Sequence, residues 1–432
     1  CPKYTGMVEV RIIRNEQERV LDGYKKRNLK EDQLALVPEI IVLDDLRKTT
    51  QATLDQRLAR INEVSREIGT LMKSGAQDQT ISLKAEVASL KEETKAMESK
   101  LQEIESSIES KLLQLPNVPH KLVPEGLTPE DNFIYKAWDK PMPDLPPNPL
   151  MHWELAKKYN LFDMELGVKI TGSGFILYRN QGAKLQRALI NFFLDEATKA
   201  GYEEVQTPYM VNAESARATG QLPDKEAQMY YMEKDDLYMI PTAEVPVTNI
   251  YRDVILKEQD FPITMTGYSP CFRREAGSYG AHVKGLNRVH QFDKVEIVRI
   301  EHPDQSEKAL EGMIAHVEGL LIKLELPYRI LRLCGGDMGF ASAITYDFEV
   351  FSAAQQRWLE VSSVSNFETF QSNRMKLRFK TDKGEMRYAH TLNGSALALA
   401  RIVASILENH QTVDGIRIPL ALQSYFGKEM IS

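Results

Sequence analysis

The chain has 432 residues, a formal net charge of −7, and 43% hydrophobic against 27% charged residues. This length predicts two or three domains with a sizeable core, and the composition is that of a soluble globular protein. The acidic balance disfavours a broadly basic nucleic-acid-binding domain, although a local basic stripe stays compatible with it. No apolar run approaches the ~18 residues that a membrane crossing needs.

The three cysteines, Cys1, Cys271 and Cys334, lie far apart and form no CxxC pair. We therefore expect neither a disulfide framework nor a zinc site, and we interpret the compartment as reducing and cytoplasmic. The N-terminus lacks the basic-then-apolar layout of a signal peptide. The six residues before Met7 are a candidate disordered or non-native extension.

Apolar residues recur at helical spacing over residues 36–72 and again after a polar break at residues 74–79. The seam positions of the second run are Leu83, Val87, Leu90, Thr94, Met97, Leu101, Ile104 and Ile108. Their steps alternate between four and three, as in a coiled coil, so residues 1–114 are predicted to form an antiparallel two-helix arm. At ~35 residues per helix, the arm would be roughly 50 Å long. A dimerisation coiled coil and a lever that reaches a large partner both fit this periodicity.

Nine prolines in residues 115–150 exclude a regular helix there and favour an extended connector. Residues 151–432 then mix amphipathic helices with successive β-rich runs that lack βαβ alternation. This order predicts an α+β domain in which helices flank an antiparallel β-sheet. No GxGxxG or GxxxxGK[ST] motif occurs, so a Rossmann or P-loop nucleotide site is not expected.

Four segments of this second domain combine charges and hydroxyls in ways that suit a binding site: residues 241–244, 271–296, 360–363 and 391–401. In the second, Arg273 and Glu275 alternate on a predicted strand and so project from one face, while Glu296 ends the return strand. An arginine fork can hold a phosphate, and carboxylates can take amines. A cross-strand ion pair explains the same residues.

The other three segments also have ordinary explanations. Thr242 can cap a helix that starts at the next residue, just before the Glu244 carboxylate. Glu360 and Ser363 supply oxygen ligands that suit Mg²⁺, and a solvated serine-rich turn is the alternative. Small residues in the last segment let a helix pack tightly on a sheet, and Arg401 would then emerge at a fixed position one and a half turns along that helix. A core helix with a surface arginine is the alternative.

Taken in order, the segments read Thr-x-Glu, Arg-x-Glu, Glu, Glu-x-x-Ser and Ser…Arg, and in this they resemble seryl-tRNA synthetases of bacterial type, which are class II aminoacyl-tRNA synthetases. Further matching stretches are Arg14-Asn15-Glu16, Thr219-Gly220-Gln221-Leu222-Pro223, Gly336-Asp337-Met338-Gly339, Ser363-Val364-Ser365-Asn366-Phe367 and Ile418-Pro419. The likeness therefore runs nearly end to end and includes the coiled-coil arm.

The resemblance implies a serine–tRNA ligase that makes seryl adenylate and pyrophosphate from L-serine and ATP, then transfers serine to the 3′ end of tRNA(Ser). Whether tRNA(Sec) is a second acceptor stays open. Mg²⁺ would accompany ATP, no zinc is expected, and residues 201–208 with the preceding helix would form part of a homodimer interface.

Site residues follow from the same resemblance. Arg273 and Arg401 would be catalytic, acting on the α- and γ-phosphates, with a stacking surface at or near Phe272. The serine positions would be Thr242, Ala243, Glu244, Glu296, Thr391 and Ser395. The ATP positions would be Arg273, Arg274, Glu275, Val289, Glu360, Val361, Ser362, Ser363 and Arg401, with Glu360 and Ser363 positioning Mg²⁺. Which of Glu244, Glu296 and Thr391 takes the serine ammonium and which the hydroxyl stays open.

The family's arm contacts the long extra arm of serine-accepting tRNA. Residues 1–114 hold 19 Lys plus Arg and 20 Asp plus Glu, a difference of −1, but recognition of RNA shape needs only a few phosphate contacts. The candidate contacts are Arg57, Arg60, Arg66, Lys73, Lys84 and Lys91.

The sequence departs from the commoner family pattern in two places. Residues 281–285 read Ala-His-Val-Lys-Gly where many relatives have Arg-Asp-Thr-Arg-Gly, in a loop that meets the tRNA acceptor end, and Ala400 stands where Gly is frequent. Two other classes remain as alternatives. A ligase that passes an amino acid to a carrier protein would be expected to lack the arm, and a structural coiled-coil protein would be expected to have lost the arginines and carboxylates of the site.

Overall fold

The computed structural model describes residues 8–224, 227–275 and 284–432. The candidate N-terminal extension and the atypical residues 281–283 lie outside the described residues. The chain folds into two compact units, Cys1–Lys25 with Leu29–Pro116, and Lys26–Asn28 with Asn117–Ser432. Over the described ranges, no helix combines the length and apolarity that a bilayer crossing requires.

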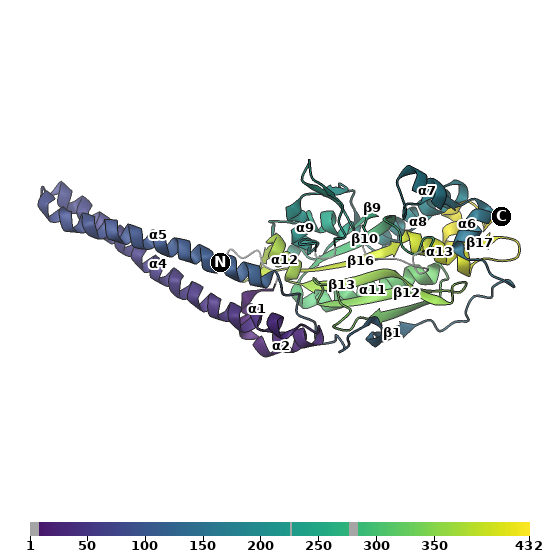
Figure 1. Ribbon diagram of the computed structural model, residues 1–432, viewed down its shortest axis with the longest axis horizontal. Coiled ribbons are helices and arrows are strands. Elements are labelled where there is room, and N and C mark those ends of the chain that lie inside the picture. Colours follow the sequence, from purple (N-terminus) through teal and green to yellow (C-terminus); the bar gives the residue numbers. More distant parts are fainter. Residues whose placement is uncertain (1–7, 225–226, 276–283) are drawn as a thin grey trace. The chain divides into compact units, whose positions relative to one another are not determined.

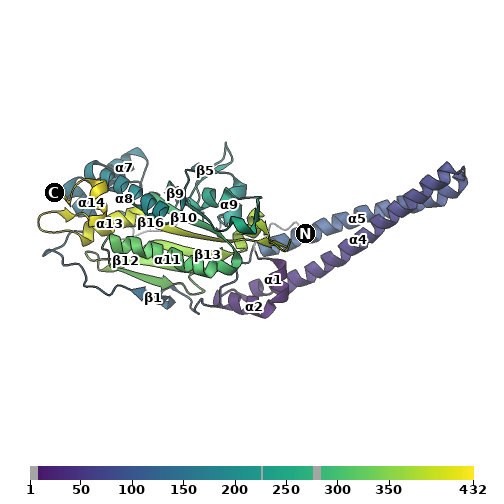
Figure 2. The ribbon, with the colours of Figure 1, turned by 180° about the vertical axis from the view of Figure 1, so that it is seen from behind.

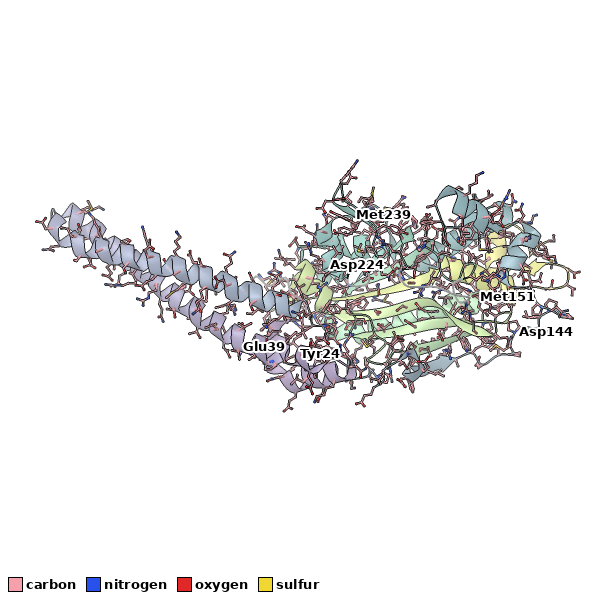
Figure 3. The ribbon with its side chains drawn as sticks, in the orientation of Figure 1. Tyr24, Glu39, Asp144, Met151, Asp224 and Met239 are labelled. Carbon is pink, nitrogen blue, oxygen red and sulfur yellow. The ribbon has the colours of Figure 1, made fainter. Side chains whose placement is uncertain are left out.

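The first unit is helical, as its apolar periodicity predicts. Its two long helices, α4 (Leu36–Lys73) and α5 (Thr80–Leu112), pack along each other, with the turn η1 (Gln77–Gln79) between them (Figure 1). The short helices α1 (Val10–Asn15), α2 (Gln17–Lys26) and α3 (Glu31–Leu34) precede them. Lys111 donates to Glu39 at 2.5 Å and joins the two long helices near their base (Glu39 is labelled in Figure 3).

A mixed, largely antiparallel sheet is the centre of the second unit. Within the described residues its eight strands lie in the order β1-β11-β12-β13-β16-β10-β9-β4, and each pair is antiparallel except β4 with β9. Their bounds are β1 (Phe133–Ala137), β4 (Glu203–Glu204), β9 (Ile263–Phe272), β10 (Gln291–Glu301), β11 (Tyr328–Arg332), β12 (Ile344–Ser352), β13 (Arg357–Glu368) and β16 (His390–Ala398). The edge strand β1 comes from the proline-rich stretch, so this part of the stretch belongs to the sheet.

Helices pack on the sheet and on each other. Figure 2 shows α11 (Ser306–Lys323) lying along the sheet, where it packs on β13 and β16, and α14 (Leu420–Phe426) beside α8 (Asn180–Lys199). The other helices are α6 (His152–Tyr159), α7 (Met164–Ile170), α9 (Ala213–Thr219), α10 (Glu244–Asn249), α12 (Phe370–Met375) and α13 (Leu399–Asn409), with the 3₁₀ turns η2 (Pro129–Asp131), η3 (Glu258–Asp260) and η5 (Pro303–Gln305). Short strands pair outside the main sheet: β2 (Phe162–Asp163) with β3 (Leu177–Tyr178); β5 (Met210–Val211), β7 (Leu237–Met239) and β6 (Tyr231–Met232); β15 (Met386–Tyr388), β14 (Arg378–Lys380) and β8 (Ile255–Lys257); and β17 (Ile416–Arg417) with β18 (Met430–Ile431).

Alternation along β10 gives the sheet two different faces. Val295 and Ile297 are fully buried in the main core, whereas Phe292, Lys294 and Glu296 line a cavity. Successive side chains of a strand point to opposite faces, so this single strand supplies both a hydrophobic layer and a polar wall.

Two predicted positions on the hairpin of β9 and β10 are wrong. β9 ends at Phe272, so Arg273 and Glu275 lie beyond the strand, and Glu275 has a left-handed φ of +47°. The Arg273 N–H still donates to the carbonyl of His290, its partner in the register of the hairpin, and the chain leaves the ladder at the next residue, whose N–H donates to the carbonyl of Gln228. Glu296 lies in the middle of β10 and does not end it.

The segment that ends in Arg401 also differs from its prediction. It is a strand as far as Ala398, and α13 begins at Leu399, so Arg401 lies in the first helical turn. The small residues serve the sheet: a Cβ on Gly394 would lie 3.0 Å from Val364 on β13 and 3.4 Å from Met313 on α11. Close packing of the sheet against α11 therefore selects glycine there.

Candidate active site

A cavity of about 460 Å³ lies over the polar face of β10, and it gathers most of the predicted site residues. Those that line it are Thr242, Glu244, Arg273, Glu275, Val289, Glu296, Glu360, Val361, Ser362, Ser363, Ser395 and Arg401. Three predicted residues do not line it. Ala243 is buried at the start of α10, and the Arg274 guanidinium lies over the Tyr230 ring, 5.9 Å from its centroid. Thr391 contacts the cavity residue Glu244 only through the Gln371 side chain.

One part of the cavity is a buried cluster around Glu296. Its Oε2 accepts a hydrogen bond from the Thr242 hydroxyl at 2.8 Å and lies 2.6 Å from the Lys294 ammonium. Lys294 also donates to the Thr242 hydroxyl at 2.9 Å, and this hydroxyl accepts the Glu244 N–H at 3.2 Å. The Thr242 hydroxyl thus sits at the centre of the cluster, and α10 begins after it at Glu244 without a side-chain cap from Ala243.

The second carboxylate, Glu244, forms no ion pair with any described residue. Its Oε1 accepts the Gln371 amide at 2.6 Å, and the Gln371 carbonyl oxygen accepts the Thr391 hydroxyl at 2.7 Å. Burial, followed by the nearby Glu296 carboxylate, raises the pKa of Glu244 to about 7. Glu244 is therefore a carboxyl that an incoming cation would ionise, and Thr391 supports it through Gln371.

Sequence reasoning missed Lys294 and Gln371. Lys294 is two residues before Glu296 on a predicted strand, so period-2 alternation could have placed both side chains on one face. Gln371 lies on the short helix α12, far in sequence from the Glu244 that it contacts, and no local signal marks it.

Arg273 is held in place by backbone and by an aromatic ring. Its Nε donates to the Pro241 carbonyl at 3.3 Å, and its guanidinium lies 5.3 Å from the centroid of Phe292. Phe292 lines the cavity and Phe272 does not, so the aromatic surface is in the predicted neighbourhood but on the return strand. An arginine anchored at Nε keeps its terminal N–H groups available for an anion.

The wall beside Arg273 is built by short polar links. Asp224, labelled in Figure 3, accepts the N–H groups of Gln228 and Met229 at 2.9 and 2.8 Å, and the Gln228 carbonyl then accepts the Arg274 N–H. Glu275 forms an ion pair with Arg288, and both line the cavity. Arg274 therefore contributes its backbone to this wall.

Arg401 is fixed by two carbonyl oxygens. Its Nε donates to the Asn287 carbonyl at 2.9 Å and its Nη1 to the Glu360 carbonyl at 2.6 Å. The Glu360 carboxylate lies 3.7 Å from the same guanidinium. A cationic group is thus presented to the cavity by two backbone segments.

A buried histidine–glutamate pair supports the Asn287 segment. His152 and Glu408 are both fully buried, and the His152 Nδ1 lies 2.6 Å from the Glu408 carboxylate. The Leu286 N–H donates to His152 Nε2 at 2.9 Å, so the ring proton is on Nδ1 and is donated to Glu408. Gln355 bridges Glu408 to the Asn287 side chain. This network ties α6 and α13 to the backbone that holds Arg401.

A bulge in β13 explains how Glu360 and Ser363 reach the same cavity. Residues three apart on a regular strand point to opposite faces, but Val361 is an extra residue between the pairs Glu349–Glu360 and Phe348–Ser362. The bulge reverses the alternation, so both side chains line the cavity. The solvated-turn alternative is wrong, because this segment is a strand.

A further carboxyl, Asp347, lies beside these two residues. It pairs in register with Ser363 across β12 and β13, and both line an adjoining cavity of about 390 Å³. Its Oδ1 is a buried oxygen without a hydrogen-bond partner among the described residues. Burial, followed by Glu360, raises the pKa of Asp347 well above its ordinary value. Three oxygen donors, one of them buried and unpartnered, fit a hard cation such as Mg²⁺.

In the first unit, all six predicted tRNA contacts are exposed. Two of them also join the long helices, because Arg57 pairs with Glu93 and Arg60 with Glu86. The remaining four, Arg66, Lys73, Lys84 and Lys91, lie further along the arm or on α5.

Comparisons with known proteins agree with this arrangement. Residues 7–119 match the family described as seryl-tRNA synthetase N-terminal domain, and residues 229–410 match the tRNA synthetase class II core domain (G, H, P, S and T). A serine–tRNA ligase of Salinibacter ruber is 48% identical over 423 residues, which are 98% of each chain. One of Akkermansia muciniphila is 44% identical over 428 residues, covering 98% of this chain and 99% of its own.

Solved structures give the same result. The crystal structure of seryl-tRNA synthetase from Pyrococcus horikoshii complexed with ATP matches with a TM-score of 0.91 and 33% identity, covering 98% of this chain and 99% of that one. The cytoplasmic serine–tRNA ligase of Naegleria fowleri in complex with AMP matches with a TM-score of 0.87 and 25% identity, covering 99% of both chains. The chain belongs to the seryl-tRNA synthetase family.

Proposed function

We propose that the chain ligates serine to tRNA(Ser) in two steps. In the first, the serine carboxylate attacks the α-phosphorus of ATP, and the bond to pyrophosphate breaks to leave seryl adenylate. In the second, a hydroxyl of the terminal ribose of the tRNA attacks the serine carbonyl, and AMP leaves. The observation that carries this proposal is one cavity that holds two carboxylates with unequal partners together with two anchored arginines.

The unequal partners orient serine. Glu296 already lies against the Lys294 ammonium, whereas the partner of Glu244 is a neutral amide, so Glu244 takes the serine ammonium. The free oxygen of Glu296 then accepts the serine hydroxyl. A site built to bond a hydroxyl rejects the analogue that lacks it by about 10⁴–10⁵, which would exclude alanine.

The arginines act on the phosphates. Negative charge develops on the α-phosphate as the carboxylate attacks, and Arg273, fixed by Pro241 and Phe292, stabilises it. The nucleophile is already ionised at neutral pH, so no general base is needed in this step. Arg401 binds the γ-phosphate. Catalysis then rests on positioning and electrostatics.

Glu360, Ser363 and Asp347 would hold Mg²⁺. A Mg²⁺ ion held there would neutralise charge on the ATP phosphates. The bulge at Val361 serves this role, since without it Glu360 and Ser363 could not share a face.

The long helices are the proposed tRNA-binding element, and the protein is proposed to act as a homodimer. The exposed basic side chains of α4 and α5 supply phosphate contacts to the extra arm of the tRNA, and shape supplies the rest. Residues 201–208 and α8 would belong to the dimer interface.

The test is amino-acid-dependent exchange of pyrophosphate into ATP, followed by charging of tRNA(Ser). Of the standard amino acids, serine alone is expected to support exchange, and Arg273→Ala is expected to abolish it while the protein keeps its fold. Exchange with a different amino acid, or exchange without charging of any tRNA, would contradict the proposal.

A further inference from the structure

Lys294 is a cationic residue of the cavity that the proposed chemistry assigns to no group of serine or ATP. Its side chain is 7% exposed and lies in contact with two residues of the serine cluster, Glu296 and Thr242, at 2.6 and 2.9 Å. A lysine is seldom buried unless it is paired, and this one is paired inside a substrate site. Its position therefore bears on which ligand the site can accept.

The charges of the cluster can be counted. Glu244 and Glu296 contribute two negative charges and Lys294 one positive charge, so the cluster has a net charge of −1 when both carboxylates are ionised. One ammonium group of a ligand brings this to zero. Without Lys294 the two ionised carboxylates would have a net charge of −2, so a ligand with two cationic groups would be needed to bring the cluster to zero.

The free oxygens of the two carboxylates are the points of contact for a ligand. Among the residues that the structure describes, neither Oε1 of Glu296 nor Oε2 of Glu244 has a hydrogen-bond partner. The Glu296 oxygen belongs to a carboxylate whose charge is already compensated, so it suits a neutral donor such as a hydroxyl. The Glu244 oxygen belongs to a carboxylate whose described partner is neutral, so it suits an ammonium.

We propose that Lys294 is a specificity-determining residue that occupies the cationic position on Glu296, so that the site accepts a ligand with one ammonium and a neutral hydrogen-bonding side chain. This deepens the proposed function and rests on it. By the same geometry Lys294 holds the Thr242 hydroxyl between Glu296 and the start of α10.

A doubly charged substrate analogue distinguishes this role from that of a purely structural lysine. The serine analogue 2,3-diaminopropionate carries a second ammonium where serine carries its hydroxyl. Lys294 excludes this second ammonium because it already pairs with the Glu296 carboxylate, which would otherwise be the counter-charge. In Lys294→Met the carboxylate of Glu296 becomes available to the second ammonium. The kcat/KM for the analogue should therefore rise relative to that for serine.

The experiment measures kcat/KM for serine and for 2,3-diaminopropionate in pyrophosphate exchange at pH 7, where a sizeable fraction of the analogue is doubly protonated. The wild-type protein is expected to prefer serine by at least about 100-fold. Lys294→Met is expected to reduce this preference by about 10–100-fold and to leave the KM for ATP unchanged. Lys294→Arg keeps the cation and should keep the preference, and Lys308→Met, at an exposed lysine of α11, is the matched control.

The outcomes separate the two claims. A folded Lys294→Met protein with the wild-type preference would overturn the role of Lys294, as would a wild-type protein that uses the analogue as well as serine. If Lys294→Met fails to fold, the Lys294→Arg and wild-type preferences decide the question. A wild-type protein without serine-dependent exchange would instead contradict the proposed function itself.

Discussion

Lowering the pH is expected to weaken serine binding through Glu244. The pKa of this carboxyl is raised to about 7 by burial and by Glu296, and Lys294 and Arg273 act in the opposite direction. The ammonium of serine interacts with the ionised form. The affinity for serine is therefore highest well above pH 7, and it decreases as the pH falls through this value.

The size of the effect follows from the fraction of Glu244 that is ionised. With a pKa of about 7, this fraction is roughly 0.91 at pH 8 and roughly 0.09 at pH 6, so the KM for serine should rise about tenfold between them. An unperturbed glutamate would be almost fully ionised at both values and would give no change. The expected rise thus depends on the burial of this one side chain.

The assay is pyrophosphate exchange at saturating ATP and Mg²⁺, with serine varied at half-unit steps from pH 6 to 8. Glu244→Gln is the control, and its serine KM should be high and independent of pH. A wild-type KM that stays flat over this range would refute the reasoning, because it would mean that Glu244 is ionised throughout or does not contact the ammonium.

Three further predictions concern support and partners. Gln371→Leu removes the hydrogen bond to the Glu244 carboxylate, worth about 1.5–3 kcal/mol, so the serine KM in exchange should rise about 10–100-fold with the ATP KM unchanged. Glu408→Leu removes the carboxylate partner of His152, so the melting temperature should fall. The ATP KM should rise more than the serine KM, because the Asn287 backbone that holds Arg401 loses its support. Deletion of residues 50–100 shortens α4 and α5 together, and it should spare serine-dependent exchange but abolish charging of tRNA(Ser); retained charging would contradict the arm's role.

Periodicity and local chemistry predicted the fold well. The long helices have apolar residues at a steady spacing, so both could be placed within a few residues. The antiparallel sheet could be predicted because several strand-like runs follow each other without intervening crossover helices. Strand ends were harder, since the chain leaves the β9 ladder where the Arg274 N–H donates to the carbonyl of Gln228, a residue distant in sequence.

Candidate site residues could be predicted from the sequence where they belong to short motifs. Glu360 and Ser363 could be named, but their shared face depends on a bulge at Val361 that only the pairing with β12 reveals. Gln371 and Asp347 could not be named, because each acts through a contact with a residue on another element. What sequence reasoning missed is therefore mostly the buried layer behind the residues that face the cavity.

The central claim is that this cavity assembles seryl adenylate with its ammonium on Glu244 and its phosphate on Arg273. A crystal structure with a non-hydrolysable seryl-adenylate analogue tests it most directly. We expect the ammonium within hydrogen-bond distance of Glu244, the serine hydroxyl at Glu296, and the phosphate mimic at Arg273. An analogue bound with its ammonium on Glu296, or outside this cavity, would contradict the account.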